Sequence, residues 1–172
     1  KMSNKKFIES IPVGPLAIVA LPGSKALGDK VDAYISGWRS ERLEAKESPI
    51  TFKGYVKDSY LLNVSVPRFG TGEAKCALKD TVRGCDLYII DDVTNHSIEY
   101  TVCGQKNHMS PDDHYADIKR VIAAASGKAR KITVIMPFLY ESRQHRRSSR
   151  ESMDCAVMLQ ELVNMGVDNI IT

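Results

Sequence analysis

The sequence predicts an α/β fold of three layers, in which an open, mostly parallel sheet carries helices on both faces. Short apolar runs rich in β-branched residues alternate with longer segments of helical period, which is typical of a parallel sheet covered by helices. The 172 residues fit one domain with its own hydrophobic core. Because 43% hydrophobic and 26% charged residues are ordinary for a globular protein, composition alone indicates no function.

The first predicted βα unit begins with residues 16–21, an apolar run that ends at Pro22 and Gly23. Ser24 is a residue type that caps helices, so we expect it to open a helix that runs to about Arg42. Apolar residues at helical spacing predict the buried face of this helix. They are Leu27, Val31, Tyr34, Ile35 and Trp38.

A surface excursion is predicted at residues 41–58, because this segment is charged and contains Pro49 and Gly54. Two strand-like runs follow, at residues 60–66 and 74–78. The link between these runs contains one proline and two glycines. That composition predicts a hairpin-like loop between two strands.

The next predicted strand is the buried run at residues 85–90, and residues 94–109 have no clear period and are expected to form a loop. A strong helix start follows, because Ser110 can cap the helix, Pro111 suits its first turn, and two aspartates favour its positive end. Gly127 is expected to end it. The predicted buried face consists of Tyr115, Ile118, Val121, Ile122 and Ala125.

Three further elements complete the predicted fold. Residues 131–138 form a strand that leads into an arginine-rich loop. Ser148 and Glu151 have the S-x-x-E spacing of a capping box, so we expect the last helix to start there, and Gly166 to end it. Residues 168–172 begin another strand.

The arginine loop, residues 143–150, is the strongest candidate for a binding site. It places four guanidinium groups in eight residues behind a predicted strand, and ligands of open α/β sheets bind at the carboxyl ends of strands. Clustered arginines suit a dense anion such as a polyphosphate. The candidate contacts are Arg143, Gln144, Arg146, Arg147 and Arg150. The alternative is a solvated basic turn that pairs with carboxylates of another subunit.

The net charge of +3 is too small to imply a general nucleic-acid or membrane binder, and subtracting the four loop arginines leaves about −1. No apolar stretch approaches the roughly 20 residues of a membrane span, and residues 1–9 do not lead into a hydrophobic signal segment. We therefore expect a cytoplasmic protein without nucleic-acid or membrane partners. Four cysteines without a C-x-x-C pair favour reduced thiols.

The 69–73 loop, with the sequence FGTGE, is a second candidate site. Phe69 can stack on a purine, and Thr71 and Glu73 can hydrogen-bond its edge. The alternative is a tight turn with an incidental phenylalanine. Asp91 and Asp92 end a strand, where they either approach a metal ion or, as is more common, cap the next turn.

Three histidines and one glycine-containing segment show no pattern of a catalytic or metal site. His96, His108 and His114 lack metal-ligand spacing and are expected to be ordinary loop and helix-start residues. Residues 23–25 lack the preceding part of a Walker loop, although they are expected to form a helix N-terminus. No nucleophile and base pattern is present.

The chain resembles the N-terminal half of ribose-phosphate pyrophosphokinases, the phosphoribosyl pyrophosphate synthetases. The segments that carry this resemblance, in the order of the family, are 69–73, 82–90, 140–144, 150–151 and 166–172. The resemblance implies a phosphoribosyltransferase type I fold with a flag-like hairpin. It also implies transfer of diphosphate from ATP to the C1 hydroxyl of ribose 5-phosphate with Mg²⁺, in a homo-oligomer whose ATP site lies between subunits.

By this resemblance, the chain (residues 1–172) is a single N-terminal domain without the C-terminal catalytic half. Arg143 and Gln144 would bind ATP in their own subunit, whereas Phe69, Thr71 and Glu73 would reach the adenine bound to the neighbouring one. Arg146, Arg147 and Arg150 would be further phosphate contacts. The resemblance implies Mg²⁺ ligands beyond Thr172 and no catalytic residue within the chain, which by itself is expected to be inactive.

The chain departs from the family pattern at His145, where the family usually has Asp, and at Ser152, where it usually has Pro. Segments 41–58 and 95–110 have the character of insertions. These departures motivate an alternative function, a non-catalytic regulatory or assembly subunit of the same family. A nucleic-acid binder that uses the arginine loop is a third hypothesis, which the modest net charge disfavours.

Overall fold

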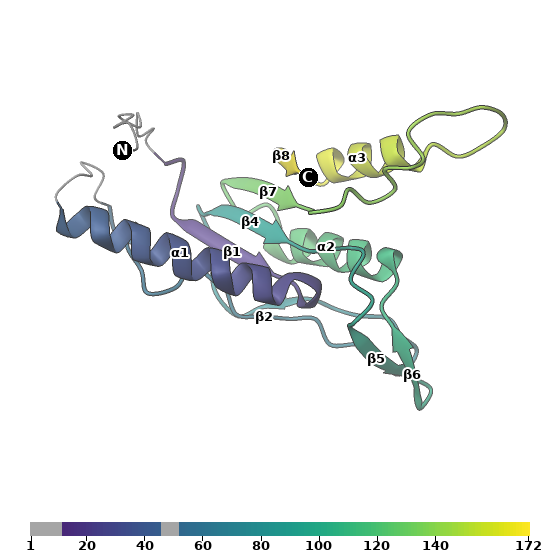
Figure 1. Cartoon of the computed structure of the whole chain (residues 1–172), viewed down its shortest axis with the longest axis horizontal. Helices are drawn as coiled ribbons and strands as arrows, with labels where there is room; N and C mark the ends of the chain where they lie inside the picture. Colours follow the sequence, from purple (N-terminus) through teal and green to yellow (C-terminus); the bar gives the residue numbers. More distant parts are fainter. Residues whose placement is uncertain (1–11, 46–51) are drawn as a thin grey trace, which may run out of the picture.

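A four-stranded parallel sheet in the order β1-β4-β7-β8 forms the centre of the molecule (Figure 1). The structure, a computed structural model, describes residues 12–45 and 52–172. The strands of this sheet are β1 (Leu16–Ala20), β4 (Asp86–Ile90), β7 (Lys131–Ile135) and β8 (Asn169–Ile171). All four predicted strands are confirmed, with ends that differ by up to three residues.

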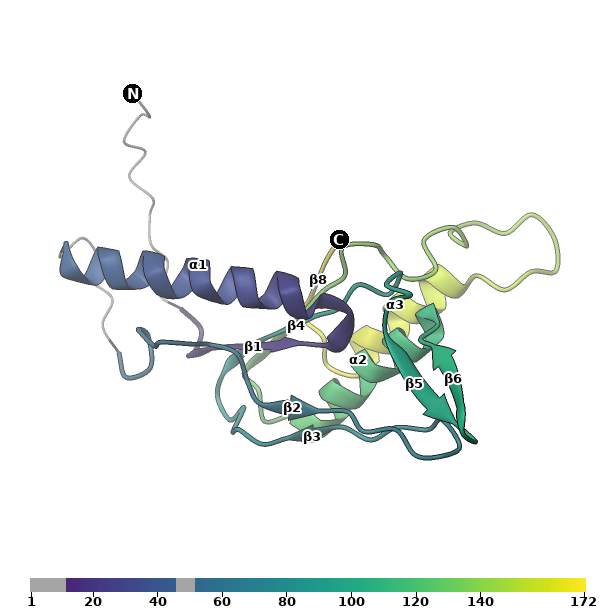
Figure 2. The same ribbon diagram turned by 60° about the horizontal axis from the view of Figure 1, so that its bottom comes forward.

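Helices cover both faces of the sheet, as Figure 2 shows. On one face lies α1 (Lys25–Glu44), and on the other lie α2 (Pro111–Ala125) and α3 (Asp154–Asn164). Side chains alternate along β4, so Ile89 packs in the larger core with α2 and α3, whereas Ile90 packs in the smaller core with α1. The predicted three-layer α/β fold is confirmed.

The inner face of α1 agrees only in part with the prediction. Leu27, Tyr34 and Trp38 are 41%, 73% and 41% exposed, and the buried residues of this helix are Gly28 and Asp32. The helix lies along β1, the edge strand of the sheet, so only a narrow stripe of its surface meets other elements (Figure 1). Apolar spacing therefore indicated the helix correctly but only part of the side that packs, since Val31 and Ile35 do pack against the smaller core.

A buried carboxylate accounts for part of this difference. Asp32 accepts hydrogen bonds from the backbone N–H of Tyr60 at 2.6 Å and from the hydroxyl of Ser59 at 2.7 Å, which fastens α1 to the segment before β2. The start of α1 also differs in detail. Ser24 ends a short 3₁₀ turn (Pro22–Ser24) and occupies the N-cap position, but its hydroxyl makes no capping hydrogen bond.

Two glycines of α1 provide a matched test of how closely this helix approaches β1. Gly28→Ala is expected to lower the free energy of unfolding by about 1–3 kcal/mol, because the added Cβ would overlap the Cβ of Ala20. Gly37→Ala is expected to raise it by about 0.5–1 kcal/mol, since nothing lies within 4 Å of the added atom. Urea denaturation measures the free energy of unfolding of both variants. Equal changes in the two variants would contradict the close approach of α1 to β1.

The start of α2 follows the prediction closely. The Ser110 hydroxyl accepts a hydrogen bond from the Asp113 backbone N–H at 3.1 Å, and the Asp113 carboxylate accepts one from the Ser110 N–H at 2.9 Å, which forms a capping box. All five predicted apolar residues of its inner face are buried. The helix ends at Ala125, and Ser126 and Gly127 follow with left-handed backbone angles.

The predicted hairpin around the 69–73 loop is confirmed, although its strands are much shorter than expected. Only β2 (Val64–Ser65) and β3 (Ala77–Leu78) are regular, and they pair antiparallel. The loop between them is closed by a hydrogen bond from the Phe69 N–H to the Glu73 carbonyl at 2.7 Å. This hairpin packs on the same side of the sheet as α2 (Figure 2).

The loop predicted at residues 94–109 is wrong, because the segment forms a second hairpin. Its strands are β5 (Glu99–Val102) and β6 (Gln105–His108), joined by Cys103 and Gly104, whose φ angles are 50° and 80°. Two consecutive left-handed residues make the tight turn that suits a two-residue hairpin. The hairpin escaped prediction because β6 is exposed along its whole length and so has no apolar period.

The predicted start of the last helix is also wrong. The Ser148 N–H and hydroxyl do contact the Glu151 carboxylate, at 3.2 and 2.9 Å, but α3 begins only at Asp154. The capping-box pair therefore closes a turn within the loop. The residues just before α3 are held by Gln144 and not by a helix cap at Ser148. The Gln144 side-chain amide donates a hydrogen bond to the Ser152 carbonyl at 2.6 Å.

The predicted excursion at residues 41–58 is only partly described, since residues 46–51 lie outside the described ranges. Its first part belongs to α1. Its last part returns to the fold at Tyr55, which is 7% exposed and lies under the Arg39 guanidinium at 4.3 Å. All four cysteines are free thiols. Among the described residues, no helix is both long and apolar enough to cross a membrane.

Candidate functional site

The carboxyl ends of β1, β4 and β7 meet at one edge of the sheet, where a cleft of about 660 Å³ opens. Residues from all three strand ends line it, including Gly23 and Ser24 after β1, Asp92 and Asn95 after β4, and Pro137 after β7. The cleft therefore lies where open α/β sheets bind ligands. The start of α1 also faces it, as expected from residues 23–25.

A second cleft of about 430 Å³ lies beside the arginine loop. Its lining includes Thr94 and His96 from the segment after β4, and Phe138, Tyr140 and Arg143 from the segment after β7. Arg143 of the loop thus lines a cleft at the carboxyl edge of the sheet. This agrees with the predicted position of the arginine loop.

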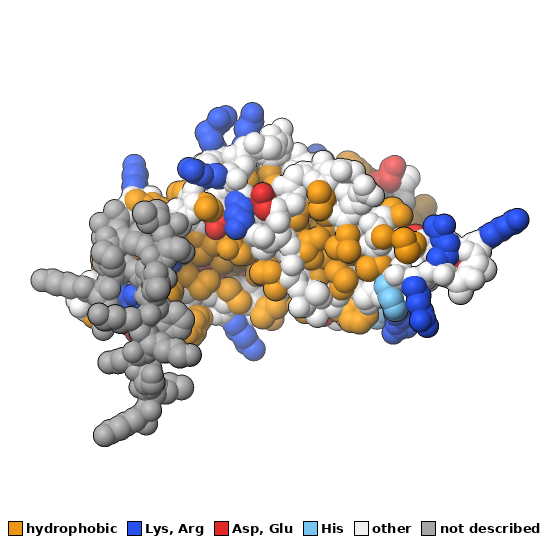
Figure 3. All heavy atoms as spheres, turned by 90° about the horizontal axis from the view of Figure 1, so that it is seen from above, with side chains coloured by type: hydrophobic (Ala, Val, Ile, Leu, Met, Phe, Trp, Pro, Cys, Tyr) orange, Lys and Arg blue, Asp and Glu red, His pale blue; other side chains and the backbone are white. Residues whose placement is uncertain are grey.

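The four loop arginines are exposed, and within the described residues their side chains form no ion pair or hydrogen bond. Figure 3 shows basic side chains projecting from the end of the molecule that the loop between β7 and α3 forms. Their charges are therefore available to an anion. Gln144 differs, because its amide N–H donates to the Ser152 carbonyl and only its side-chain oxygen is left to accept.

The 69–73 loop lies apart from the arginine loop, at the tip of the β2–β3 hairpin beside β5 and β6 (Figures 1 and 2). Phe69 is 50% exposed, as expected for a stacking aromatic. The Thr71 hydroxyl donates to the Glu73 carboxylate at 2.9 Å. One chain therefore does not bring the two candidate loops together.

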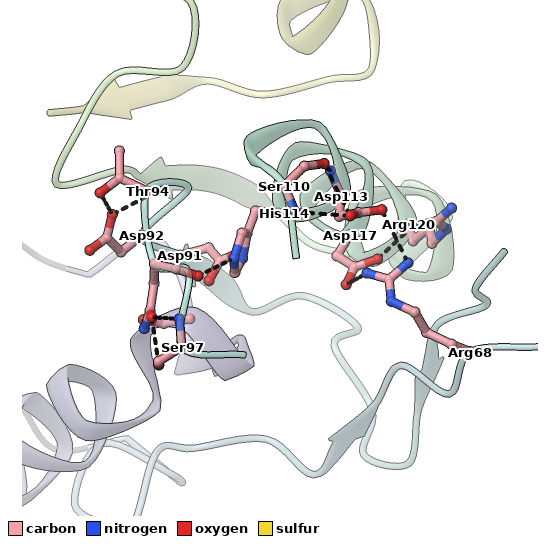
Figure 4. Close-up of polar contacts among 12 residues, drawn as sticks. Arg68, Asp91, Asp92, Thr94, Ser97, Ser110, Asp113, His114, Asp117 and Arg120 are labelled. Atoms are coloured by element: carbon pink, nitrogen blue, oxygen red, sulfur yellow. Dashed lines mark hydrogen bonds and ion pairs between the residues drawn. The ribbon is translucent and has the colours of Figure 1, made fainter. Parts of the chain in front are cut away.

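A fully buried histidine and carboxylate pair supports the carboxyl edge, and sequence reasoning missed it. His114 and Asp91 are each 0% exposed, and Nδ1 of His114 lies 3.0 Å from Oδ2 of Asp91, as Figure 4 shows. Nε2 of His114 lies 2.9 Å from the carbonyl oxygen of Asn95. Because a carboxylate and a carbonyl both accept, the ring suits the doubly protonated imidazolium, which donates from both nitrogens.

The direction of the pKa shift of His114 agrees with the doubly protonated imidazolium. Burial by itself lowers the pKa of His114, but the hydrogen bond and negative charge of Asp91 outweigh it and raise the pKa above the ordinary value of 6.5. Burial raises the pKa of Asp91, and the contact with His114 opposes that rise. Gly23 makes room for the pair, because a Cβ added there would lie 2.5 Å from Asp91 Oδ1.

Asp92 takes the turn-capping role that was the alternative to metal binding. Its carboxylate accepts hydrogen bonds from the Thr94 N–H at 2.9 Å and the Thr94 hydroxyl at 2.7 Å (Figure 4). The described part of the chain contains no group of three or more His, Cys, Asp or Glu side chains that could hold a metal ion.

A second buried polar cluster joins α2 to the 69–73 loop. Arg68, whose side chain is 9% exposed, donates to Asp117 at 2.8 Å and lies 3.7 Å from Asp113. Burial raises the pKa of Asp117, and the charges of Arg68 and Arg120 oppose that rise. One sequence signal could have found these residues, because His114 and Asp117 stand at helical spacing from the buried Val121.

One protein family matches most of the chain. The family model described as the N-terminal domain of ribose phosphate pyrophosphokinase matches residues 16–166, which is most of the chain. The chain belongs to this family. The resemblance first inferred from five short segments is thus confirmed.

Similar curated proteins include ribose-phosphate pyrophosphokinases. The one from Haemophilus ducreyi is 31% identical over 112 residues, which cover 64% of this chain and 31% of that protein. Ribose-phosphate pyrophosphokinase 1 of Schizosaccharomyces pombe is 28% identical over 112 residues, which cover 64% of this chain and 24% of that protein. The chain therefore matches about a third or less of the length of these pyrophosphokinases.

A solved structure has the same fold. The crystal structure of phosphoribosylpyrophosphate synthetase from Mycobacterium smegmatis aligns with a TM-score of 0.62 over 91% of this chain and 41% of that chain. The sequence identity is 19%, so this likeness concerns the fold alone. It agrees with the three-layer architecture of the pyrophosphokinase N-terminal domain described above.

Proposed function

We propose that this chain is the ATP-binding N-terminal domain of a ribose-phosphate pyrophosphokinase, which transfers diphosphate from ATP to ribose 5-phosphate. The observation that carries the proposal is the arginine loop. It presents four exposed guanidinium groups, unpaired within the described residues, at the carboxyl edge of the sheet in a chain of this family. Exposed guanidinium groups without carboxylate partners are suited to phosphate oxygens.

Each candidate residue has a chemical task in this proposal. Arg143, which lines the cleft beside the loop, contacts the phosphates of ATP, and Gln144 offers its side-chain oxygen as an acceptor. Phe69 stacks on the adenine, and Thr71 and Glu73 hydrogen-bond its edge. Further contacts to the phosphates come from Arg146, Arg147 and Arg150.

The proposed reaction requires no covalent bond between these residues and the substrates. The C1 hydroxyl oxygen of ribose 5-phosphate attacks the β-phosphorus of ATP, the bond between the β-phosphorus and its bridging oxygen to the α-phosphate breaks, and AMP leaves. Negative charge on the transferred group is stabilised by positioned cations, so no protein nucleophile is required. Arginine side chains supply part of that charge.

Mg²⁺ is part of the proposal as the ion that accompanies ATP and neutralises phosphate charge. The described residues contain no cluster suited to hold it, so no role in binding the metal is assigned to them. They bind and orient the nucleotide instead.

The separation of the two candidate loops supports an ATP site shared between subunits of a homo-oligomer. Because the 69–73 loop and the arginine loop lie apart within one chain, we propose that each site combines the arginine loop of one subunit with the 69–73 loop of its neighbour (Figures 1 and 2). Such a site exists only in the assembled protein. Its ligands are ATP and, for the whole protein, ribose 5-phosphate.

Mixing two inactive variants of the full-length gene product tests this arrangement. Phe69→Ala and Arg143→Ala subunits, each nearly inactive alone, are expected to recover diphosphate transfer after they are dissociated and reassembled together. The physical reason is that some mixed sites combine an intact loop from each subunit. The measurement is the rate of AMP release in the presence of ribose 5-phosphate.

The matched control mixes Phe69→Ala with Glu73→Ala, whose defects lie on the same loop, and no recovery is expected. Recovery in neither mixture would overturn the shared site. A wild-type protein that assembles but transfers no diphosphate would support the alternative of a non-catalytic regulatory subunit.

A further inference from the structure

We infer that Arg68 is a positioning residue for the 69–73 loop, and that the β5–β6 hairpin helps Arg68 to hold this loop in place. The inference rests on the proposed nucleotide-binding role of this loop. Arg68 stands immediately before the loop and pairs with Ala74 in the bridge that closes its base. Arg68 therefore belongs to the base of the loop.

The first anchor of the loop is a buried charge cluster on α2. One guanidinium nitrogen of Arg68 donates to Asp117 at 2.8 Å, and the other donates to the Gly72 carbonyl at 3.3 Å. A single side chain thus connects the far side of the loop to α2, as Figure 4 shows for its Asp117 contact. The side chain of Asp117 is 3% exposed, so solvent screens this ion pair little.

The second anchor comes from β5. The Arg68 guanidinium lies over the ring of Tyr100 at 4.6 Å from its centroid, and the Tyr100 hydroxyl donates to Asp113 at 3.1 Å. Asp113 also forms the capping box of α2 with Ser110. The arginine is therefore enclosed between an aromatic ring on one hairpin and two carboxylates on a helix.

The tip of the loop is held as well. The backbone N–H of Cys103, in the turn between β5 and β6, donates to the Gly70 carbonyl at 3.0 Å. A Cβ added at Gly72 would lie 3.1 Å from Cγ2 of Val102, so the loop and the hairpin are in close contact. The β5–β6 hairpin, an apparent insertion with no predicted role, thus braces the loop.

These contacts leave the proposed binding side chains free while they hold the backbone. Phe69 remains 50% exposed, and within the described residues the side chains of Thr71 and Glu73 hydrogen-bond only to each other. A loop that is already held in place loses less conformational entropy when a ligand binds, which strengthens binding without a new contact. We therefore assign Arg68 an effect on nucleotide affinity through the loop, without a contact to the nucleotide.

The test substitutes Arg68 in the full-length gene product. Arg68→Met is expected to raise the KM for ATP about fivefold, a change of about 1 kcal/mol in binding, and to leave the KM for ribose 5-phosphate unchanged. It is also expected to speed hydrogen exchange at the backbone amides of Phe69, Gly72 and Cys103, which report directly on the loop. Kinetics and exchange measured by mass spectrometry give the two readouts.

Arg120→Met is the matched control, because Arg120 pairs with the other oxygen of Asp117 but does not contact the loop. It is expected to change neither readout. Arg68→Met combined with Asp117→Asn is a second variant that leaves no unpaired buried carboxylate if the single variant folds poorly. It is expected to reproduce both effects of Arg68→Met.

Three results would overturn the inference: wild-type exchange in the folded variant, an equal effect of Arg120→Met, or a lower kcat with both KM values unchanged. The last would show that Arg68 supports only the fold. Phe69→Ala separates the inference from the proposed function. If Phe69→Ala binds ATP normally while Arg68→Met still speeds hydrogen exchange of the loop amides, the proposed nucleotide-binding role of the loop is wrong. The inference that Arg68 holds the loop in place is then still supported.

Discussion

Arg143→Ala in the full-length gene product is expected to lower kcat/KM for diphosphate transfer about a hundredfold, which corresponds to about 2.7 kcal/mol. Arg143 lines the cleft beside the arginine loop, is exposed, and has no ion-pair partner among the described residues. A guanidinium group in that position can make two charge-assisted hydrogen bonds to phosphate oxygens. Steady-state kinetics and the binding of ATP measured by calorimetry check the prediction.

Arg83→Ala is the matched control for Arg143→Ala. Arg83 is also exposed, but it lies in the turn before β4, at the amino end of the sheet and far from the proposed site. Both variants lose one surface charge, so a general charge effect would appear in both. An Arg143→Ala protein with wild-type affinity for ATP and wild-type turnover would refute the assignment of this residue.

His114→Leu is expected to lower the free energy of unfolding by about 3–5 kcal/mol, because it leaves the Asp91 carboxylate buried without its charged partner. The carbonyl of Asn95 would lose its donor as well. For a chain of this size the loss corresponds to a decrease in Tm of about 10 °C. Urea denaturation and calorimetry measure the two quantities.

His108→Gln provides the control for His114→Leu, because the His108 side chain is 64% exposed. A change within about 0.5 kcal/mol is expected, as for other surface substitutions. If His114→Leu were equally mild, the buried pair would not be an ion pair that supports the carboxyl edge of the sheet.

The same pair gives the stability a dependence on pH. The pKa of His114 is raised in the folded protein, so folding favours the bound proton. This contribution is fully present below the unfolded pKa of 6.5 and is lost as the pH rises through the higher folded pKa. Stability should therefore fall as the pH rises above 6.5, and His114→Gln, which does not titrate, should remove that slope.

Local patterns predicted most of the scaffold. The β-branched runs of β1, β4 and β7 were recognisable because the strands of a parallel sheet are buried on both faces. The start of α2 was recognisable because its cap is formed within four residues, by Ser110 and Asp113. The position of the arginine loop followed from the strand that precedes it.

The structural predictions were wrong at positions where the local sequence pattern and the tertiary packing disagree. The β5–β6 hairpin was missed because β6 is exposed along its whole length and therefore lacks an apolar period. Ser148 and Glu151 form their pair without a helix, because the chain remains irregular up to Asp154. The outward position of Tyr34 followed from the place of α1 over an edge strand.

By itself, the sequence determined the α/β class, the order of the central elements, the family resemblance and the two loops proposed to bind ATP. Only the tertiary structure showed that these loops lie apart and that buried charge pairs support them. Asp91 and His114 are 23 residues apart, and Arg68 and Asp117 are 49. Apolar period and capping are properties of neighbouring residues, whereas the partner of a buried charge depends on how distant segments pack.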